Sequence, residues 1–101
     1  MKILLVCSAG MSTSMLVKKM NQAAQEKNID AQVDATAEAG LNNELESTDV
    51  ILIGPQVRYL EKKIGEKAAP YNVPVAVIDS IAYGMMDGMK VLEQAIALQK
   101  S

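Results

Sequence analysis

The chain contains no histidine, no tryptophan and no phenylalanine, and it has a single cysteine among its 101 residues. Without histidine it cannot use Ser-His or Cys-His catalysis, and any phosphoryl group that it carries must sit on another residue type. One cysteine excludes an internal disulfide and, because histidine is absent, every common zinc site. We therefore expect neither a metal nor any other cofactor.

Aromatic side chains, surplus charge and long apolar runs are also scarce. The three tyrosines are too few for stacking on nucleic-acid bases, and a net charge of −2 gives no electrostatic footprint for DNA, RNA or an anionic membrane. No apolar run approaches the ~20 residues that cross a bilayer, and the apolar N-terminus is too short for a signal peptide. We expect one soluble, cytoplasmic domain over residues 1–101, with no nucleic-acid partner and no membrane insertion.

Hydrophobic residues, in contrast, make up half of the chain. Three apolar, β-branched runs predict parallel strands that are covered on both faces, at residues 3–6, 50–53 and 75–78. The stretch 30–36 alternates polar and small apolar residues, which is typical of a strand at the edge of a sheet.

Between these strands lie segments with helical periodicity, at about 12–27, 56–68 and 86–99, and a weaker one at about 38–45. The first helix is expected to bury an apolar stripe of Met15, Leu16, Met20, Ala23 and Ala24. Strands alternating with helices predict an α/β domain: a doubly wound, four-stranded parallel sheet in the order 2-1-3-4, with helices on both faces.

The lone cysteine, Cys7, stands at the end of the first predicted strand. In a sheet of this order the chain reverses direction between strands 1 and 3, and ligands bind beyond the carboxyl ends of the strands at that point. Backbone amides at the start of the next helix favour negative charge and favour thiolate over thiol. We predict that Cys7 is a nucleophile that carries a phosphoryl group; the alternative is a buried, inert cysteine.

The loop after Cys7 is rich in small and hydroxyl-bearing residues, which let the backbone approach an anion and offer N-caps for the helix. The predicted phosphate-binding residues are Ser8, Ala9, Gly10, Met11, Ser12, Thr13 and Ser14. A second loop, at 54–56, flanks the same crevice, and its Gln56 either hydrogen-bonds a phosphate oxygen or caps a helix.

Three motifs, CSAGMSTS at 7–14, GPQV at 54–57 and VIDSIAYGMMDG at 77–88, together span most of the chain. In these motifs and in length the chain resembles the IIB component of the lactose/cellobiose branch of the bacterial sugar phosphotransferase system. The resemblance implies that Cys7 accepts a phosphoryl group from a phosphohistidine of the partner IIA protein. It further implies transfer to a disaccharide of the cellobiose, lactose or chitobiose class, bound by the membrane IIC component, and a phosphate held by residues 8–14.

Low-molecular-weight tyrosine phosphatases share this fold and a loop that begins with cysteine, which makes a phosphatase-like enzyme the main alternative. Their loop closes with an arginine six positions after the cysteine, where this chain has Thr13, and its only arginine is Arg58. Loss of that clamp weakens hydrolysis. Asp79, after the last strand, either caps a helix or protonates a leaving thiolate as in the phosphatases. An arsenate reductase would need further cysteines, and a receiver domain would need clustered acids after the first strand.

Four side chains are candidates for an apolar docking surface for IIA and IIC, although the methionines are equally compatible with a place in the core. They are Met11, Tyr83, Met85 and Met86. Arg58 either steers the incoming phosphate or is an ordinary solvated side chain.

Overall fold

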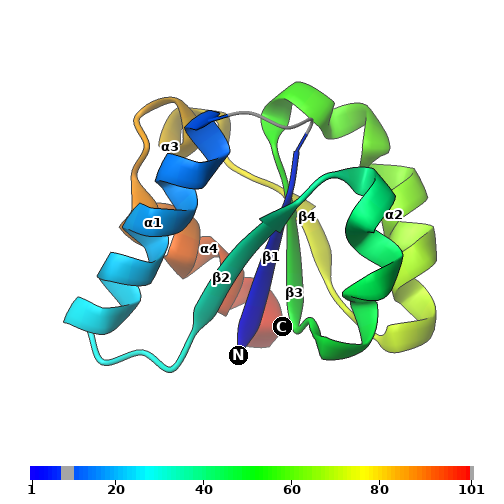
Figure 1. Ribbon diagram of the computed structural model, residues 1–101, viewed down its shortest axis with the longest axis horizontal. Coiled ribbons are helices and arrows are strands. Elements are labelled where there is room, and N and C mark those ends of the chain that lie inside the picture. The colour runs from blue at the N-terminus through cyan, green and yellow to red at the C-terminus, as the bar shows by residue number, and fades with distance from the viewer. Residues whose placement is uncertain (8–10, 101) are drawn as a thin grey trace.

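The computed structural model describes residues 1–7 and 11–100, and for Met11 and Ser12 it describes the backbone alone. Four parallel strands form one sheet in the order β2-β1-β3-β4 (Figure 1). The strands are β1 (Lys2–Val6), β2 (Gln32–Thr36), β3 (Val50–Ile53) and β4 (Val75–Val77). The predicted strands and their order are confirmed.

Helices cover both faces of this sheet. One face is covered by α1 (Met11–Glu26), α3 (Ser80–Gly84) and α4 (Gly88–Lys100). The other is covered by α2 (Glu61–Ala68) and by three 3-10 helices, η1 (Glu38–Asn43), η2 (Leu45–Ser47) and η3 (Pro55–Leu60). A short 3-10 turn, η4 (Ala69–Tyr71), leads from α2 to β4.

The two central strands, β1 and β3, each serve two hydrophobic clusters, because successive side chains point to opposite faces. In β1, Ile3 and Leu5 pack with α1 and α4, whereas Leu4 and Val6 pack with α2 and the 3-10 helices. All four are at most 1% exposed. A sheet covered on both faces therefore explains why its central strands are apolar at every position.

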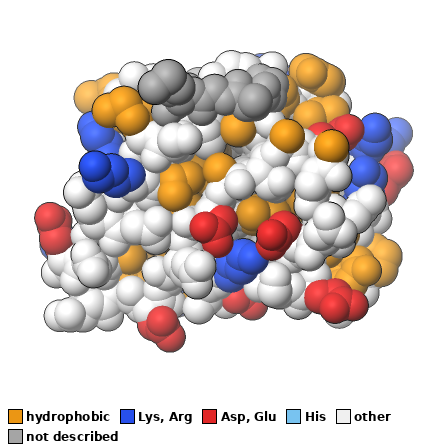
Figure 2. Space-filling model, in the orientation of Figure 1, with side chains coloured by type: hydrophobic (Ala, Val, Ile, Leu, Met, Phe, Trp, Pro, Cys, Tyr) orange, Lys and Arg blue, Asp and Glu red, His pale blue; other side chains and the backbone are white. Residues whose placement is uncertain are grey.

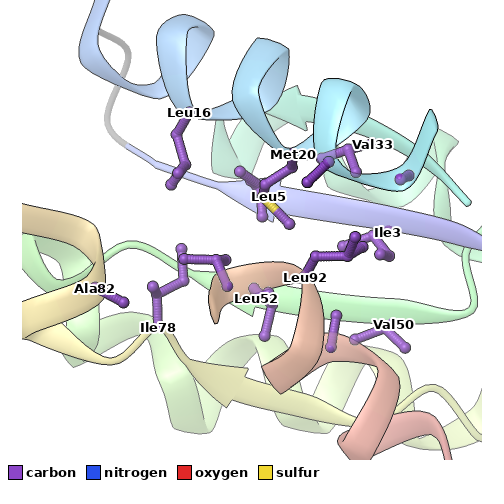
Figure 3. Packing of buried hydrophobic residues seen from close by; sticks show 14 residues of the cluster. Ile3, Leu5, Leu16, Met20, Val33, Val50, Leu52, Ile78, Ala82 and Leu92 are labelled. Carbon is purple, nitrogen blue, oxygen red and sulfur yellow. The ribbon is translucent and has the colours of Figure 1, made fainter. Parts of the chain in front are cut away.

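The apolar stripe of α1 packs against this sheet, with one member placed differently from the prediction. Figure 3 shows Leu16 and Met20 extending from α1 toward Leu5 on β1, and both are fully buried. Met15, in contrast, is 57% exposed, so its predicted burial is wrong. Leu16, Met20 and Ala23 recur at i, i+4 and i+7, while Met15 lies one residue, about 100°, to the side of that line.

Two predicted helices differ in type from what the structure shows. The segment 38–45 is mostly 3-10, as η1 and η2, and buries Leu41 and Leu45. The segment 56–68 is α-helical only from Glu61, since Val57 has φ −120° and ψ 30°, outside the helical range. Val57 is buried in the second cluster. Its backbone departs from helical geometry because its side chain packs into that cluster.

The stretch between β4 and the last helix contains a short helix, α3, that the periodicity of the sequence does not indicate. Asp79 precedes α3, and its Oδ2 accepts a hydrogen bond from the Ala82 N–H at 3.1 Å. Met86 then adopts a positive φ of 53°, and the Asp87 Oδ1 accepts from the Lys90 N–H at 3.1 Å. The last helix therefore begins at Gly88 and not at Met86 as predicted.

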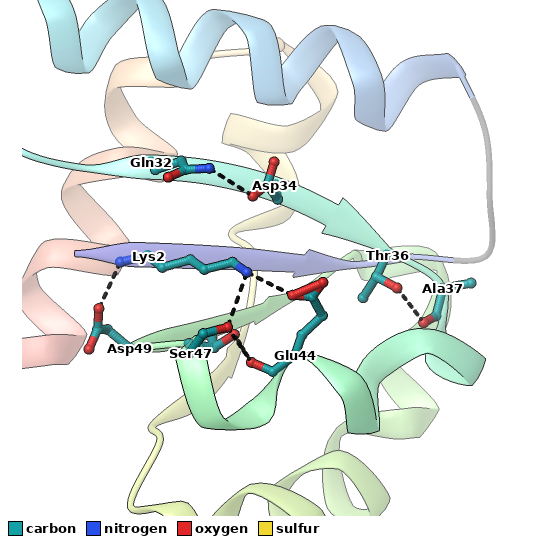
Figure 4. A network of polar contacts seen from close by, with 9 residues as sticks. Lys2, Gln32, Asp34, Thr36, Ala37, Glu44, Ser47 and Asp49 are labelled. Atoms are coloured by element: carbon teal, nitrogen blue, oxygen red, sulfur yellow. Dashed lines mark hydrogen bonds and ion pairs between the residues drawn. The ribbon is translucent and has the colours of Figure 1, made fainter.

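Polar contacts fix the ends of the strands remote from Cys7. The Lys2 N–H donates to Asp49 Oδ2 at 2.7 Å, and Lys2 Nζ lies 2.7 Å from Glu44 Oε2 and 3.3 Å from Ser47 Oγ (Figure 4). Both chain ends lie at this side of the molecule, whereas the start of α1 and α3 lie at the other, where β1 ends (Figure 1). We call that other side the carboxyl end of the sheet.

The outer edge of β2 is covered by a side chain of α1. Asn21 Nδ2 donates to the Val33 carbonyl at 3.1 Å, and the Val33 N–H donates to Asn21 Oδ1 at 3.0 Å. One amide side chain thus replaces both hydrogen bonds that a further strand would make to Val33.

We expect Asn21→Ala to lower the free energy of unfolding by about 1–2 kcal/mol, because two hydrogen bonds to half-buried backbone groups are lost. Gln22→Ala is the matched control, since Gln22 is the exposed neighbour on the same helix, and it should stay within about 0.5 kcal/mol of the parent. Urea unfolding of the three proteins measures the difference. Equal midpoints for the two variants would show that the Asn21 contacts contribute nothing.

Candidate functional site

Cys7 lies where β1 ends, between its two neighbouring strands. The Cys7 N–H donates to the Thr36 carbonyl at the end of β2 at 3.1 Å, and the Gly54 N–H donates to the Val6 carbonyl at 2.9 Å. Cys7 is partly exposed and belongs to neither hydrophobic cluster. The alternative of a buried cysteine in the core is therefore wrong, and the residue stands at the topological switch point of the sheet.

Not all of the predicted phosphate-binding residues can be placed. Ser8, Ala9 and Gly10 lie outside the described residues, as do the side chains of Met11 and Ser12. Helix α1 begins at Met11, so residues 12–14 lie within its first turn, and their predicted use as N-caps is wrong. The first amides of a helix have no partner within that helix, and α1 starts four residues after Cys7.

The two remaining members of that set behave differently. Thr13 is 4% exposed, one of the two buried polar residues among those described. Its Oγ1 lies 3.4 Å from the Tyr83 hydroxyl of α3. Ser14 is exposed. The sequence does not predict that Thr13 is buried and Ser14 exposed. Thr13 is buried because α3 packs beside the start of α1.

Gln56 also contacts Tyr83. Its Nε2 donates to the Tyr83 hydroxyl at 2.9 Å, so the alternative that Gln56 caps a helix is wrong. A Cβ built on Gly54 would lie 2.9 Å from Gln56 Oε1 and 3.7 Å from Cys7 Cβ. The Gln56 side chain therefore lies across Gly54, close to Cys7, and glycine at position 54 provides the space.

The structure shows one predicted role for Asp79 and leaves Arg58 in solvent. Asp79 caps α3 through its hydrogen bond to the Ala82 N–H, as described above, and this confirms the capping interpretation. The Asp79 N–H is itself bound by Gln94 Oε1 at 3.1 Å. Arg58 is exposed in η3 and forms no ion pair with any described residue, which is compatible with both of its predicted roles.

Exposed apolar side chains gather on the elements that start at the carboxyl end of the sheet. Met15, Tyr59, Ile81 and Met85 are 57–74% exposed, and Figure 2 shows hydrophobic side chains along the upper edge of this face. Of the predicted docking residues, Met85 is exposed, whereas Tyr83 and Met86 pack partly against the first cluster. The sequence does not predict that Tyr59 and Ile81 are exposed, because their spacing does not differ from that of residues in the core.

The rest of the described chain offers no second centre of this kind. No group of three or more His, Cys, Asp or Glu residues that could hold a metal ion occurs in residues 1–7 and 11–100. In the same part of the chain, no helix has the length and apolar character needed to cross a membrane. Two open cavities, of about 450 and 590 Å³, are lined by residues remote from Cys7.

Residues 2–94 match the family described as "PTS system, Lactose/Cellobiose specific IIB subunit". The chain belongs to this IIB family. As a IIB component of the phosphotransferase system it is a phosphotransferase, and IIB components work in general with IIA and IIC partners.

Relatives of this IIB chain differ in the sugar that their names give. It is 45% identical over 97 residues to the oligo-beta-mannoside-specific EIIB component of Bacillus subtilis (strain 168), covering 96% of this chain and 94% of the relative. It is also 45% identical over 98 residues to the galactose-specific EIIB component of Lactococcus lactis subsp. cremoris (strain MG1363), covering 92% and 91%.

A solved structure agrees in fold and in sequence. The solution structure of the cellobiose-specific phosphotransferase IIB component protein from Borrelia burgdorferi superimposes with a TM-score of 0.82 at 45% identity, covering 99% of this chain and 92% of that one. The same identity to proteins named for three sugars shows that overall similarity does not select one of them.

Proposed function

We propose that Cys7 is the phosphorylation site of this IIB component and that residues 8–14 hold the phosphate. The observation that carries the proposal is the position of Cys7: partly exposed, at the end of β1, between the ends of β2 and β3, and four residues before α1. Fixed amide donors at a helix start stabilise an anion there.

Two transfers account for the reaction. In the first, the Cys7 thiolate attacks the phosphorus of a phosphohistidine on IIA; the S–P bond forms, the N–P bond breaks, and the electron pair returns to the imidazole, which takes up a proton. In the second, a sugar hydroxyl attacks the same phosphorus; the O–P bond forms, the S–P bond breaks, and the hydroxyl proton passes to a base or water. The thiolate is restored at the end.

The proposed acceptor is a disaccharide of the cellobiose, lactose or chitobiose class, bound by a membrane IIC protein, and the proposed donor is a IIA protein in the cytoplasm. The position that carries an arginine in low-molecular-weight phosphatases is occupied here by a buried, uncharged threonine, Thr13. Without that bidentate clamp, attack by water lacks its main electrostatic stabilisation. A phosphocysteine that resists water suits a carrier.

Protection from alkylation tests the assignment without any mutation. Because Cys7 is the only thiol, iodoacetamide labels this chain at one position. We expect prior incubation with phosphorylated IIA to block that labelling, because the sulfur is then bonded to phosphorus. Mass spectrometry of the intact chain and its peptides should locate the added phosphate on Cys7.

The control is the same incubation with unphosphorylated IIA, after which alkylation should proceed normally. A chain that gains a phosphate yet alkylates at the unprotected rate would carry the group on another residue, and the assignment would be lost. Sustained release of phosphate from an aryl phosphate would favour the phosphatase alternative.

A further inference from the structure

One tyrosine oxygen connects three elements at the carboxyl end of the sheet. The Tyr83 hydroxyl of α3 accepts a hydrogen bond from Gln56 Nε2 at 2.9 Å and lies 3.4 Å from Thr13 Oγ1. Gln56 follows β3, Tyr83 follows β4 and Thr13 follows β1. Side chains that come after three of the four strands are thus held together at a single atom.

This chain of contacts begins beside Cys7 and ends in the helix that follows it. The Gln56 amide lies across Gly54, where an added Cβ would be 3.7 Å from Cys7 Cβ. Thr13 is in the first turn of α1 and is 4% exposed, and its hydroxyl contact with Tyr83 is part-buried. The contacts therefore fix the first turn of α1 relative to the end of β1.

The value of a fixed first turn follows from electrostatics. Amide donors stabilise developing charge best when they are already oriented, because no free energy is then spent on moving them during the reaction. A displacement of about 1 Å at such a centre can cost as much as 100-fold in rate. Hydrogen bonds that hold α1 in place thus act on the reaction without touching the phosphate.

We propose that Tyr83 and Gln56 are positioning residues for phosphoryl transfer at Cys7, and that they act by holding the first turn of α1 through Thr13. The inference rests on the proposed role of Cys7. Both residues act through another group, so removing their polar atoms should slow transfer while leaving the affinity for the donor unchanged.

Tyr83→Phe is the direct test, because it removes the oxygen at the centre and keeps the ring. We expect the single-turnover rate constant for transfer from phosphorylated IIA to fall about three- to tenfold, the effect of ordinary hydrogen bonds, with no change in the IIA concentration that gives half the maximal rate. The ³¹P resonance of the phosphorylated chain should shift. Tyr71→Phe is the matched control, since Tyr71 lies in η4, before β4, and should change neither value.

Two further variants separate positioning from folding. Gln56→Met keeps the length of the side chain and removes its amide. Gly54→Ala leaves every hydrogen-bonding group present but places a Cβ 2.9 Å from Gln56 Oε1, and the φ of −61° and ψ of 141° at Gly54 suit alanine. Both should reproduce the rate loss and the ³¹P shift, with melting temperatures within a few degrees of the parent.

An arm without IIA keeps this inference distinct from the proposed function. The rate of Cys7 alkylation by iodoacetamide should change about two- to fivefold in Tyr83→Phe, because a displaced helix start alters the surroundings of the sulfur. The inference would be overturned if Tyr83→Phe had the transfer rate, the ³¹P resonance and the alkylation rate of the parent. It would also be overturned if transfer slowed only in variants that had lost stability. Phosphate on another residue of the parent would overturn the proposed function and this inference with it, whereas phosphate on Cys7 with parental transfer and alkylation in Tyr83→Phe would overturn this inference alone.

Discussion

Cys7→Ser is expected to abolish phosphorylation of this chain by phosphorylated IIA, with a loss in transfer rate of at least about 1000-fold. Serine keeps the size and the position of the side chain, but its hydroxyl is far less nucleophilic than a thiolate and leaves less readily. Because the chain contains no histidine and one cysteine, no second thiol and no imidazole can replace it. Transfer of radiolabelled phosphate from IIA, followed on denaturing gels, measures the loss.

The fold should tolerate this change, so lost activity can be separated from lost structure. Cys7 is only partly exposed but belongs to neither core cluster, and we expect the variant to melt within a few degrees of the parent. Sugar phosphorylation in the presence of IIA and IIC should disappear in parallel. Label that persists on folded Cys7→Ser protein would place the phosphate on a different residue.

Gly88→Ala is expected to cause the largest loss of stability among single-methyl additions, about 2–3 kcal/mol and roughly 10–20 °C in Tm. Gly88 begins α4 and packs against the backbone of α1. A Cβ there would lie 2.6 Å from the Lys19 carbonyl carbon, 2.8 Å from its oxygen and 2.9 Å from its Cβ. Two of these atoms are backbone, so the helices must separate to admit the methyl group. Calorimetry or urea unfolding measures the effect.

Gly65→Ala is the matched control within the same chain. Gly65 lies inside α2, and a Cβ there would meet no atom within 4 Å. Alanine should therefore stabilise the protein by about 0.5–1 kcal/mol, because it lowers the conformational entropy of the unfolded chain and suits a helix. Variants that shift in the same direction would refute the assignment of close packing between α1 and α4 at Gly88.

Most of the sheet could be predicted from the sequence, because strands that are buried on both faces are apolar at consecutive positions. The runs at 3–6 and 50–53 are apolar at every position, and the alternating stretch before Thr36 marks an edge strand. The helical regions are harder to predict. Val57 leaves the helical range to fill the second cluster, and α3 is a five-residue helix started by the Asp79 cap, too short for periodicity to reveal.

The candidate site was predictable to the extent that it depends on local order in the chain. A cysteine after a buried strand and before a helix falls at the switch point of any sheet with this order, and Cys7 does. The contacts of Gln56 and Thr13 with Tyr83 join residues that are 27 and 70 positions apart in sequence. Such contacts cannot be predicted from the spacing of residues in the sequence. They form because the segments that follow β1, β3 and β4 pack against one another.

Both ends of the chain lie on the side of the molecule opposite the start of α1 (Figure 1). A flexible tether, an affinity label or a fused protein attached there lies at the opposite end of the sheet from Cys7. Immobilised or fused forms of this protein can thus be used to measure encounters with donor and acceptor directly, because the attachment leaves the approach to the sulfur open.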